Sequence, residues 1–163
     1  NDEELEDRLR LYSGHGMRPR YYHKVIGINS RLDSMQAAVL NVKINHLDDA
    51  IAGRQKNAAL YQELFTQIGL SDEITLPVTK FGDGHVWNQF TIRVHRGQRD
   101  DLKAFLAEKN VGSEIYYPVP LHMQKCFQSL GYQPEDLPET FKASQEVLSL
   151  PIFPELGKSE QLR

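Results

Sequence analysis

The sequence predicts an α+β fold, in which a long helical spine precedes a small, mostly antiparallel sheet with helices. Apolar residues recur at helical spacing from about residue 31 to residue 68, a longer run than most globular helices. The pattern then changes to period two over residues 90–94, which is typical of a half-buried strand. After the spine, the predicted order of elements is strand, helix, strand, helix, helix, strand.

A short helix is predicted over residues 2–12, ahead of the spine. Its first turn is acidic and its last turn carries arginines, an arrangement that complements the helix dipole. Leu5 and Leu9 form an apolar stripe on this helix, and Gly14 and Gly16 end it.

The spine has recognisable start and stop signals. Ser30, three residues before Asp33, forms an incomplete capping box and predicts the helix start. Gly53 predicts a bend, and Gly69 predicts the C-terminal cap. The apolar surface of this helix is broad, so we expect it to need a partner surface. One of its apolar lines is Leu40, Ile44, Leu47 and Ile51.

The remaining elements are shorter. Residues 99–109 read as a helix with Leu102, Phe105 and Leu106 facing inward, and Gly112 closes it. The other predicted elements are a strand over 113–117 that Pro118 and Pro120 end, helices near 121–130 and 138–148, and a strand over 148–153.

Composition excludes several classes of protein. The 163 residues carry a net charge of −3, whereas general nucleic-acid binders are usually strongly basic. The single cysteine excludes an internal disulfide, and no apolar run approaches the ~20 residues that span a bilayer. We therefore expect a soluble, cytoplasmic protein. The chain starts without Met inside a predicted helix and ends just after a possible N-cap at Ser159, so a piece of a longer protein is expected.

A basic loop lies between the first helix and the spine. From Arg8 to Leu32 the sequence contains no Asp or Glu. The loop has three interpretations: a solvated loop, a single-stranded nucleic-acid site that stacks bases on Tyr21 and Tyr22, or a phosphate site. Asn29 favours the third, because it precedes a helix start and its amide can donate to a phosphate oxygen. The cations are Arg8, Arg10, Arg18, Arg20, Lys24 and Arg31.

A second unusual stretch, residues 115–122, places two tyrosines and a histidine around two prolines. Loops held by a rigid scaffold often carry sites, although a strand end with aromatic packing explains the composition equally well. His122 and Cys126 are four residues apart and could share a helix face. Two ligands do not make a structural zinc site, and a nucleophilic Cys–His pair would lack an orienting third group. We expect no metal and a structural cysteine.

Two motifs point to a known family. The pattern G-x-N-x-R-x-D/E-x-x-Q-A-A runs from Gly27 to Ala38, and the pattern P-x-P-L-H-x-Q runs from Pro118 to Gln124. With the segments DEELEDRLRLYSGHG, HVWNQFTIRV and LSLPIFPEL, they appear in order along nearly the whole chain. The chain thereby resembles the sugar aminotransferases of the DegT/DnrJ/EryC1/StrS family, a branch of the fold-type-I pyridoxal-phosphate enzymes.

The resemblance implies the carboxy-terminal portion of a two-domain subunit. Residues 1–30 would be the tail of the large cofactor domain and an interface loop, 31–69 the connecting helix or helices, and 70–163 a small α+β domain. It also implies a homodimer with shared active sites, and no nucleic-acid or membrane partner.

The resemblance also implies roles for individual residues. Asn29 matches the asparagine that reaches across the dimer to the cofactor phosphate, and Arg31 matches its neighbour near the phosphate or the sugar nucleotide. His122, with Tyr116 or Tyr117, matches the loop that lines the substrate entrance, and His23 is placed with these substrate residues. The Schiff-base lysine lies upstream in the family, so no catalytic residue is assigned and this portion is expected to be inactive alone.

The implied function is transfer of an amino group, from glutamate, to a keto group on a nucleotide-linked sugar, with pyridoxal 5'-phosphate as the cofactor. Its product would serve polysaccharide or glycosylated natural-product synthesis. Two alternatives stay open. One is a non-catalytic regulatory or binding relative, which the residue at the upstream lysine position would distinguish. The other is nucleic-acid binding through the basic loop.

Overall fold

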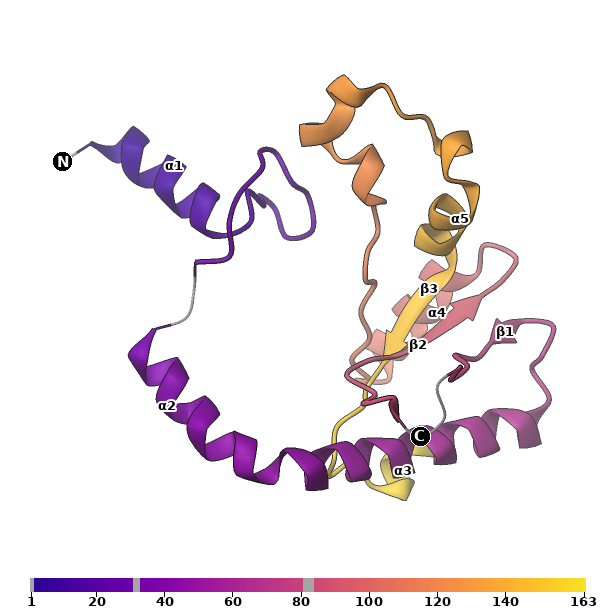
Figure 1. Ribbon diagram of the computed structural model, residues 1–163. Helices are drawn as coiled ribbons and strands as arrows, with labels where there is room; N and C mark the ends of the chain where they lie inside the picture. Colours follow the sequence, from indigo (N-terminus) through magenta and orange to yellow (C-terminus); the bar gives the residue numbers. More distant parts are fainter. Residues whose placement is uncertain (1, 31–32, 81–83) are drawn as a thin grey trace. The chain divides into compact units, whose positions relative to one another are not determined.

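The computed structural model describes residues 2–30, 33–80 and 84–163 (Figure 1). The chain forms two compact units. The first, here called the loop unit, comprises Asn1–Val39 and Tyr117–Ser144. The second, the sheet unit, comprises Leu40–Tyr116 and Gln145–Arg163.

The predicted spine is a helical run with a break in a different place from the one expected. It consists of α2 (Ser34–Lys43), a 3₁₀ turn η1 (Ile44–His46) and α3 (Leu47–Ile68). The break in α-helical structure therefore falls at 44–46, and α3 continues without interruption through Gly53, where a bend was predicted. Gly69 ends α3 as predicted, with a left-handed backbone (φ 76°) and its N–H donating to the Phe65 carbonyl at 3.1 Å.

Gly53 allows the C-terminal segment to pack closely on α3. A Cβ at this position would lie 2.9 Å from Cα of Pro154, so only glycine allows the C-terminal segment to approach α3 this closely. One helical turn further on, the buried Asn57 side chain donates to the carbonyls of Phe153 (2.9 Å) and Pro154 (3.3 Å). The two residues together hold the 153–154 backbone against the helix.

The sheet has three antiparallel strands in the order β1-β2-β3 (Figure 1), which confirms the predicted small antiparallel sheet. Strand β2 (Phe90–Val94) is the centre, and β3 (Val147–Leu150) pairs with it in the register Phe90↔Leu150. The short edge strand β1 (Ile74–Thr75) was not predicted. The strand expected over 113–117 is wrong in extent, because only the bridge Glu114↔Ser149 forms there.

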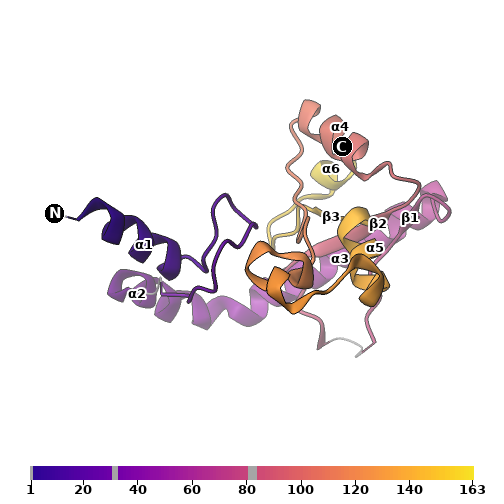
Figure 2. The ribbon, with the colours of Figure 1, turned by 90° about the horizontal axis from the view of Figure 1, so that it is seen from above.

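The core lies in the sheet unit, between the strands and α3, which runs beside them in both ribbon views (Figure 2). Alternate residues of β2 point into it, as the period-two pattern predicts, and its side chains Phe90, Ile92 and Val94 are at most 3% exposed. The Tyr61 and Trp87 rings lie 4.9 and 5.5 Å from that of Phe90. The other buried members are Ala58, Leu148 and Leu156.

Helix α4 (Arg99–Glu108) covers part of this core and matches its predicted range. Leu102 and Leu106 pack on the core as expected, whereas Phe105 is exposed, so its inward placement was wrong. Asn110, with φ 56°, takes the left-handed position after the helix, ahead of the predicted Gly112. A last short helix, α6 (Lys158–Gln161), starts after Gly157 and not at Ser159.

The loop unit consists of short helical elements joined by loops. Helix α1 (Glu3–Ser13) is confirmed, with Asp2 capping it through the Leu5 N–H at 3.0 Å. The helix predicted near 121–130 is two 3₁₀ turns, η3 (Leu121–Met123) and η4 (Lys125–Leu130), which Gln124 separates in an extended conformation. The turn η5 (Pro134–Asp136) and helix α5 (Pro138–Glu146) follow, and α5 ends two residues before the predicted limit.

The cap of α2 also differs from the prediction. The carboxylate of Asp33 accepts from the Gln36 N–H at 2.8 Å, and the Asp33 carbonyl accepts from Ala37 at 2.9 Å. Asp33 is therefore the N-cap, three residues after the predicted Ser30. Large apolar side chains along this helical run are exposed, as its broad apolar pattern predicts: Met35, Val39, Leu40, Val42, Ile44 and Leu47.

Candidate functional site

The segment that carries Asn29 folds back onto the end of α1. The Ile28 N–H donates to the Tyr12 carbonyl at 2.8 Å, and the His15 N–H donates to the Ile28 carbonyl at 3.1 Å. The Ser30 N–H donates to Ser13 at 3.2 Å, so Asn29 lies between two backbone hydrogen bonds. Its side chain is exposed. We refer to residues 14–30 as the arm; Arg31, the other predicted cofactor residue, lies outside the described residues.

Two glycines allow the arm to fold this tightly. A Cβ at Gly16, where φ is 67°, would overlap the carbonyl of Val25, and a Cβ at Gly27 would overlap the backbone nitrogen of Gly16. Any side chain at either position would separate the two sides of the arm. The first glycine of the G-x-N-x-R motif is therefore needed to bring the Asn29 segment against the end of α1.

The folded arm is less positive than its sequence suggests, because acidic side chains of α1 pair with nearby arginines. Arg18 forms an ion pair with Asp7 of α1 at 2.6 Å, and Arg10 pairs with Glu6 at 2.8 Å. The guanidinium of Arg20 lies 4.5 Å from the centre of the Tyr21 ring. The acids of α1 thus neutralise part of the basic stretch, and a phosphate-binding role depends more on hydrogen-bond donors such as Asn29 than on net charge.

The proline loop contributes His122 and Tyr117 to the same unit. His122 is 9% exposed, and its ring lies edge-on to Tyr132 at 6.2 Å. Its Nε2 atom is buried and has no hydrogen-bond partner within residues 2–30, 33–80 and 84–163. Tyr117 is exposed, and its ring meets the Tyr21 ring edge-to-face at 5.4 Å. An imidazole nitrogen buried in this way is a hydrogen-bonding group that the described residues leave unsatisfied.

His23 and Gln124 tie the arm to the proline loop. The Gln124 Oε1 atom accepts from the His23 N–H at 3.0 Å, and its Nε2 atom donates to the Tyr21 carbonyl at 2.9 Å. The sequence pattern did not predict this role of Gln124. The one signal available was its place at the end of the P-x-P-L-H-x-Q motif.

Tyr116, the remaining predicted substrate residue, belongs to the sheet unit. It lines a cleft of about 340 Å³ together with Asn88, Glu114 and Ser149. The structure thus brings Asn29, His23, Tyr117 and His122 into one unit and places Tyr116 in the other.

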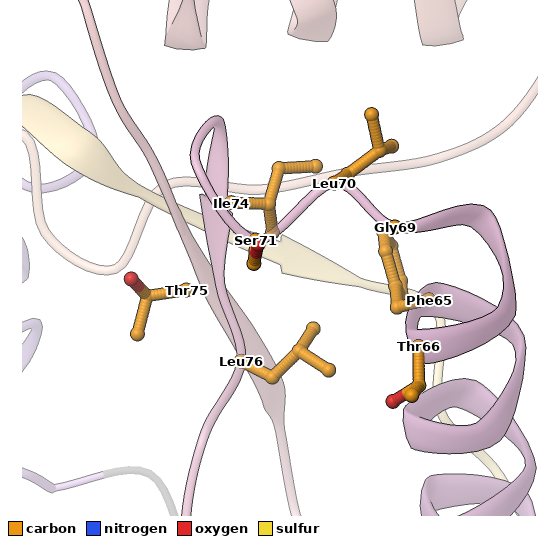
Figure 3. Close-up of a pocket in the computed structure, with 8 residues that line it drawn as sticks. All are labelled: Phe65, Thr66, Gly69, Leu70, Ser71, Ile74, Thr75 and Leu76. Carbon is orange, nitrogen blue, oxygen red and sulfur yellow. The ribbon is translucent and has the colours of Figure 1, made fainter.

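A second cleft of the sheet unit, about 470 Å³, lies between the end of α3 and strand β1 (Figure 3). The side chains that line it are apolar or carry a hydroxyl, with Phe65, Leu70, Ile74 and Leu76 as the large ones. It offers no charged group to a ligand, so we assign it no chemistry.

Metal ligation finds no support in the described part of the chain. No group of three or more His, Cys, Asp or Glu side chains there could hold a metal ion. His122 and Cys126 lie on separate 3₁₀ turns, so they do not share a helix face as predicted. Among the described residues, no helix is both long and apolar enough to cross a bilayer.

The arrangement of spine and antiparallel sheet matches part of the pyridoxal-phosphate aminotransferase fold. The chain aligns over 99% of its length with 42% of DesV from S. venezuelae, solved in complex with a ketimine intermediate (TM-score 0.69, 38% identity). It also aligns over 98% of its length with 38% of ntda from Bacillus subtilis, solved with bound cofactor PMP (TM-score 0.63, 33% identity). The fold therefore defines the class of protein as an aminotransferase portion.

The sequence comparison identifies the family within that class. The profile of the DegT/DnrJ/EryC1/StrS aminotransferase family matches residues 1–163, and the chain belongs to this family. It is 48% identical over 161 residues to a protein of Geobacillus stearothermophilus named "Pleiotropic regulatory protein". It is 37% identical over 160 residues to dTDP-3-amino-3,6-dideoxy-alpha-D-galactopyranose transaminase of Aneurinibacillus thermoaerophilus. These alignments cover 99% and 98% of the chain, which spans 42% of the length of each relative.

Proposed function

We propose that this chain is the carboxy-terminal portion of a pyridoxal-phosphate-dependent aminotransferase, which moves an amino group from glutamate to a keto group on a nucleotide-linked sugar. The observation that carries the proposal is the family match over residues 1–163, in which Gly27 to Asn29, the first three residues of the G-x-N-x-R motif, lie on an arm with a hydrogen-bonded backbone. The transaminase relative named for a dTDP-amino sugar supports the substrate class.

The residues of the arm fit the phosphate end of the cofactor and not its reactive end. Asn29 presents an exposed, uncharged amide between two backbone hydrogen bonds, and an amide N–H is a suitable donor to a phosphate oxygen. Arg31 would contact the phosphate or the sugar nucleotide from the same side. When bound, the cofactor supplies the electron sink for the transfer. The lysine that moves the proton lies upstream of this portion, so the portion alone is inactive.

The proline loop would line the entrance for the sugar nucleotide. His122 offers a buried nitrogen that the described residues leave unsatisfied, and a substrate hydroxyl is a suitable partner for it. Tyr117 and His23 lie in the same unit as His122 and would complete this entrance, whereas Tyr116 keeps its proposed substrate role from the family resemblance alone. An aromatic face and neutral donors suit a sugar nucleotide, whose charge resides mainly on its phosphates.

We further propose that the protein works as a cytoplasmic homodimer with shared active sites. Residues 1–30 would be the tail of the cofactor domain, 31–69 the connecting helices, and 70–163 the small domain. The exposed apolar side chains of α2 and η1 support a partner surface, because a soluble protein rarely leaves such a row in water.

The experiment that tests the cofactor role is Asn29→Ala in the full-length protein. Loss of one hydrogen bond to a charged phosphate should weaken cofactor binding about tenfold. The measurement is an equilibrium titration with pyridoxal phosphate, followed by the absorbance of the bound cofactor. Asn45→Ala is the matched control, because Asn45 is an exposed asparagine whose side chain donates to the Asn41 carbonyl of its own helical run. Equal affinities in both variants would remove Asn29 from the site.

A second candidate is a non-catalytic regulatory relative, which the 48% identical "Pleiotropic regulatory protein" favours. Turnover of keto-sugar nucleotides with glutamate by the full-length protein decides between the two candidates. Tight cofactor binding without turnover, together with a residue other than lysine at the upstream position, would support the regulator. A third possibility, nucleic-acid binding through the arm, predicts an affinity that falls steeply with salt.

A further inference from the structure

We propose that Gln124 is a positioning residue, which locks the arm that carries Asn29 to the loop that carries His122. The inference rests on the proposed function, because the arm is taken to reach the cofactor phosphate. The structural evidence for it is the set of hydrogen bonds that the buried Gln124 side chain forms.

The Gln124 amide is almost fully buried, at 4% exposure, and both of its ends are used. Oε1 accepts from the His23 N–H at 3.0 Å. Nε2 donates to the Tyr21 carbonyl at 2.9 Å and to the Val119 carbonyl at 3.3 Å. One side chain therefore links two segments that are about a hundred residues apart in the sequence.

Only glutamine meets these demands at this position. Glutamate keeps the acceptor but, when ionised, places a charge against two carbonyl oxygens and donates to neither. Asparagine is one methylene shorter, and methionine fills the space without either function. Each replacement leaves buried backbone groups without partners, which costs more than the hydrogen bond itself contributes.

Two further hydrogen bonds connect His23, the partner of Gln124, to the segment that carries Asn29. The Nδ1 atom of His23 lies 2.8 Å from the His15 carbonyl, and because a carbonyl only accepts, Nδ1 carries the proton. The His15 N–H in turn donates to the carbonyl of Ile28, the residue before Asn29. Greater mobility of the side chain at position 124 would therefore increase the mobility of the backbone at Asn29.

The same residue sets the turn that carries His122. Gln124 is extended (φ −66°, ψ 143°) at the junction of η3 and η4. Its N–H donates to the Leu121 carbonyl at 3.1 Å, and its carbonyl accepts from Phe127 at 2.9 Å. The edge-to-face contact of Tyr21 with Tyr117 adds a second link between the two segments.

The test uses the full-length protein and two readouts. The first is hydrogen–deuterium exchange over residues 15–30 without cofactor, and the second is the affinity for pyridoxal phosphate. Gln124→Met should raise exchange in this segment and weaken cofactor binding, each by roughly tenfold, since three hydrogen bonds of a buried amide are lost. Gln128→Met is the matched control, because Gln128 is an exposed glutamine of η4, and it should change neither readout.

Gln124→Glu provides a conservative variant in case Gln124→Met does not fold. A protonated carboxyl can donate to one carbonyl, so its exchange and cofactor affinity should approach those of the wild type at acidic pH and depart from them as the carboxyl ionises. A merely space-filling role would not produce this pH dependence, and its absence would overturn the inference.

Two other outcomes separate this inference from the proposed function. Unchanged exchange over residues 15–30 in Gln124→Met would overturn the positioning role whatever the cofactor affinity. Raised exchange with unchanged cofactor affinity would also overturn it if Asn29→Ala weakens binding. If Asn29→Ala has no effect either, the failure lies with the proposed cofactor contact.

Discussion

The sheet unit and the loop unit are held together by different forces. Every buried hydrophobic side chain of the core cluster belongs to the sheet unit. In the described part of the loop unit, the buried polar side chains are His122, Gln124 and Ser144, and no large aliphatic side chain is buried. Apolar burial therefore stabilises the sheet unit, whereas hydrogen bonds at single residues order the loop unit.

This difference bears on function because the predicted residues of the arm and His122 lie in the loop unit. A segment held by few buried contacts opens locally at lower free energy than a packed core. Leu9, Ile26 and Ile28 are also exposed there, which fits the proposed homodimer.

The largest effect should come from emptying the core of the sheet unit. Phe90→Ala removes a fully buried ring that packs on Tyr61 and Trp87, and should lower the free energy of unfolding by about 3–5 kcal/mol. Urea unfolding followed by far-UV circular dichroism and by the fluorescence of Trp87, the one tryptophan, measures it. Phe105→Ala, at an exposed site, should cost less than about 1 kcal/mol. Similar losses in both variants would contradict a core centred on β2.

An intermediate effect should appear at alkaline pH. Burial, and then the charge of Glu160, raise the pKa of Tyr61 from 10.0 to about 12. Because the folded pKa lies above the unfolded value, this phenol's contribution is complete below pH ~10 and is lost as the pH rises towards 12. The loss over that window should reach about 2 kcal/mol.

The variant Tyr61→Phe should remove this part of the alkaline decline. It should also cost about 1 kcal/mol at neutral pH, because the hydroxyl donates to the Pro151 carbonyl at 3.1 Å. Urea unfolding at a series of pH values measures both effects, with exposed Tyr22→Phe as the control. An identical alkaline decline in wild type and Tyr61→Phe would refute the assignment.

The smallest effect on stability should come from the N-cap of α2. Asp33→Ala removes the cap of the Gln36 N–H and should cost about 1 kcal/mol, seen as faster exchange of the Gln36 amide. Ser30→Ala should leave that amide unchanged, because Asp33 and not Ser30 is the cap. If Ser30→Ala has the larger effect, the helix starts where the sequence pattern predicted.

Features that depend on neighbouring residues were predictable. The alternation of Phe90 to Val94, the range of α4 and the glycine cap at Gly69 follow from local periodicity and backbone preference. Features that depend on distant partners were not. The strand expected near Glu114 is only a bridge to Ser149. Gly53 predicted a bend in the helix, whereas in the structure its missing side chain leaves room for Pro154.

The candidate site shows the same division. Motif resemblance suggested roles for Asn29 and His122, which stay predictions, but it gave no role to Gln124, whose partners Tyr21 and His23 lie about a hundred residues away. The basic character of the arm was overestimated because Asp7, outside the acid-free stretch, pairs with Arg18 in space. Charge counted along a sequence ignores acids that folding brings close.

The sequence by itself determined the family, the helical run and the inward face of the central strand, because motifs and side-chain periodicity are properties of consecutive residues. Only the tertiary structure decided that Arg18 pairs with Asp7, that Gly53 leaves room for Pro154 and how the arm is held. These depend on contacts between segments far apart in the chain, and partly buried backbone groups such as the His23 N–H find their partner only once the chain has folded.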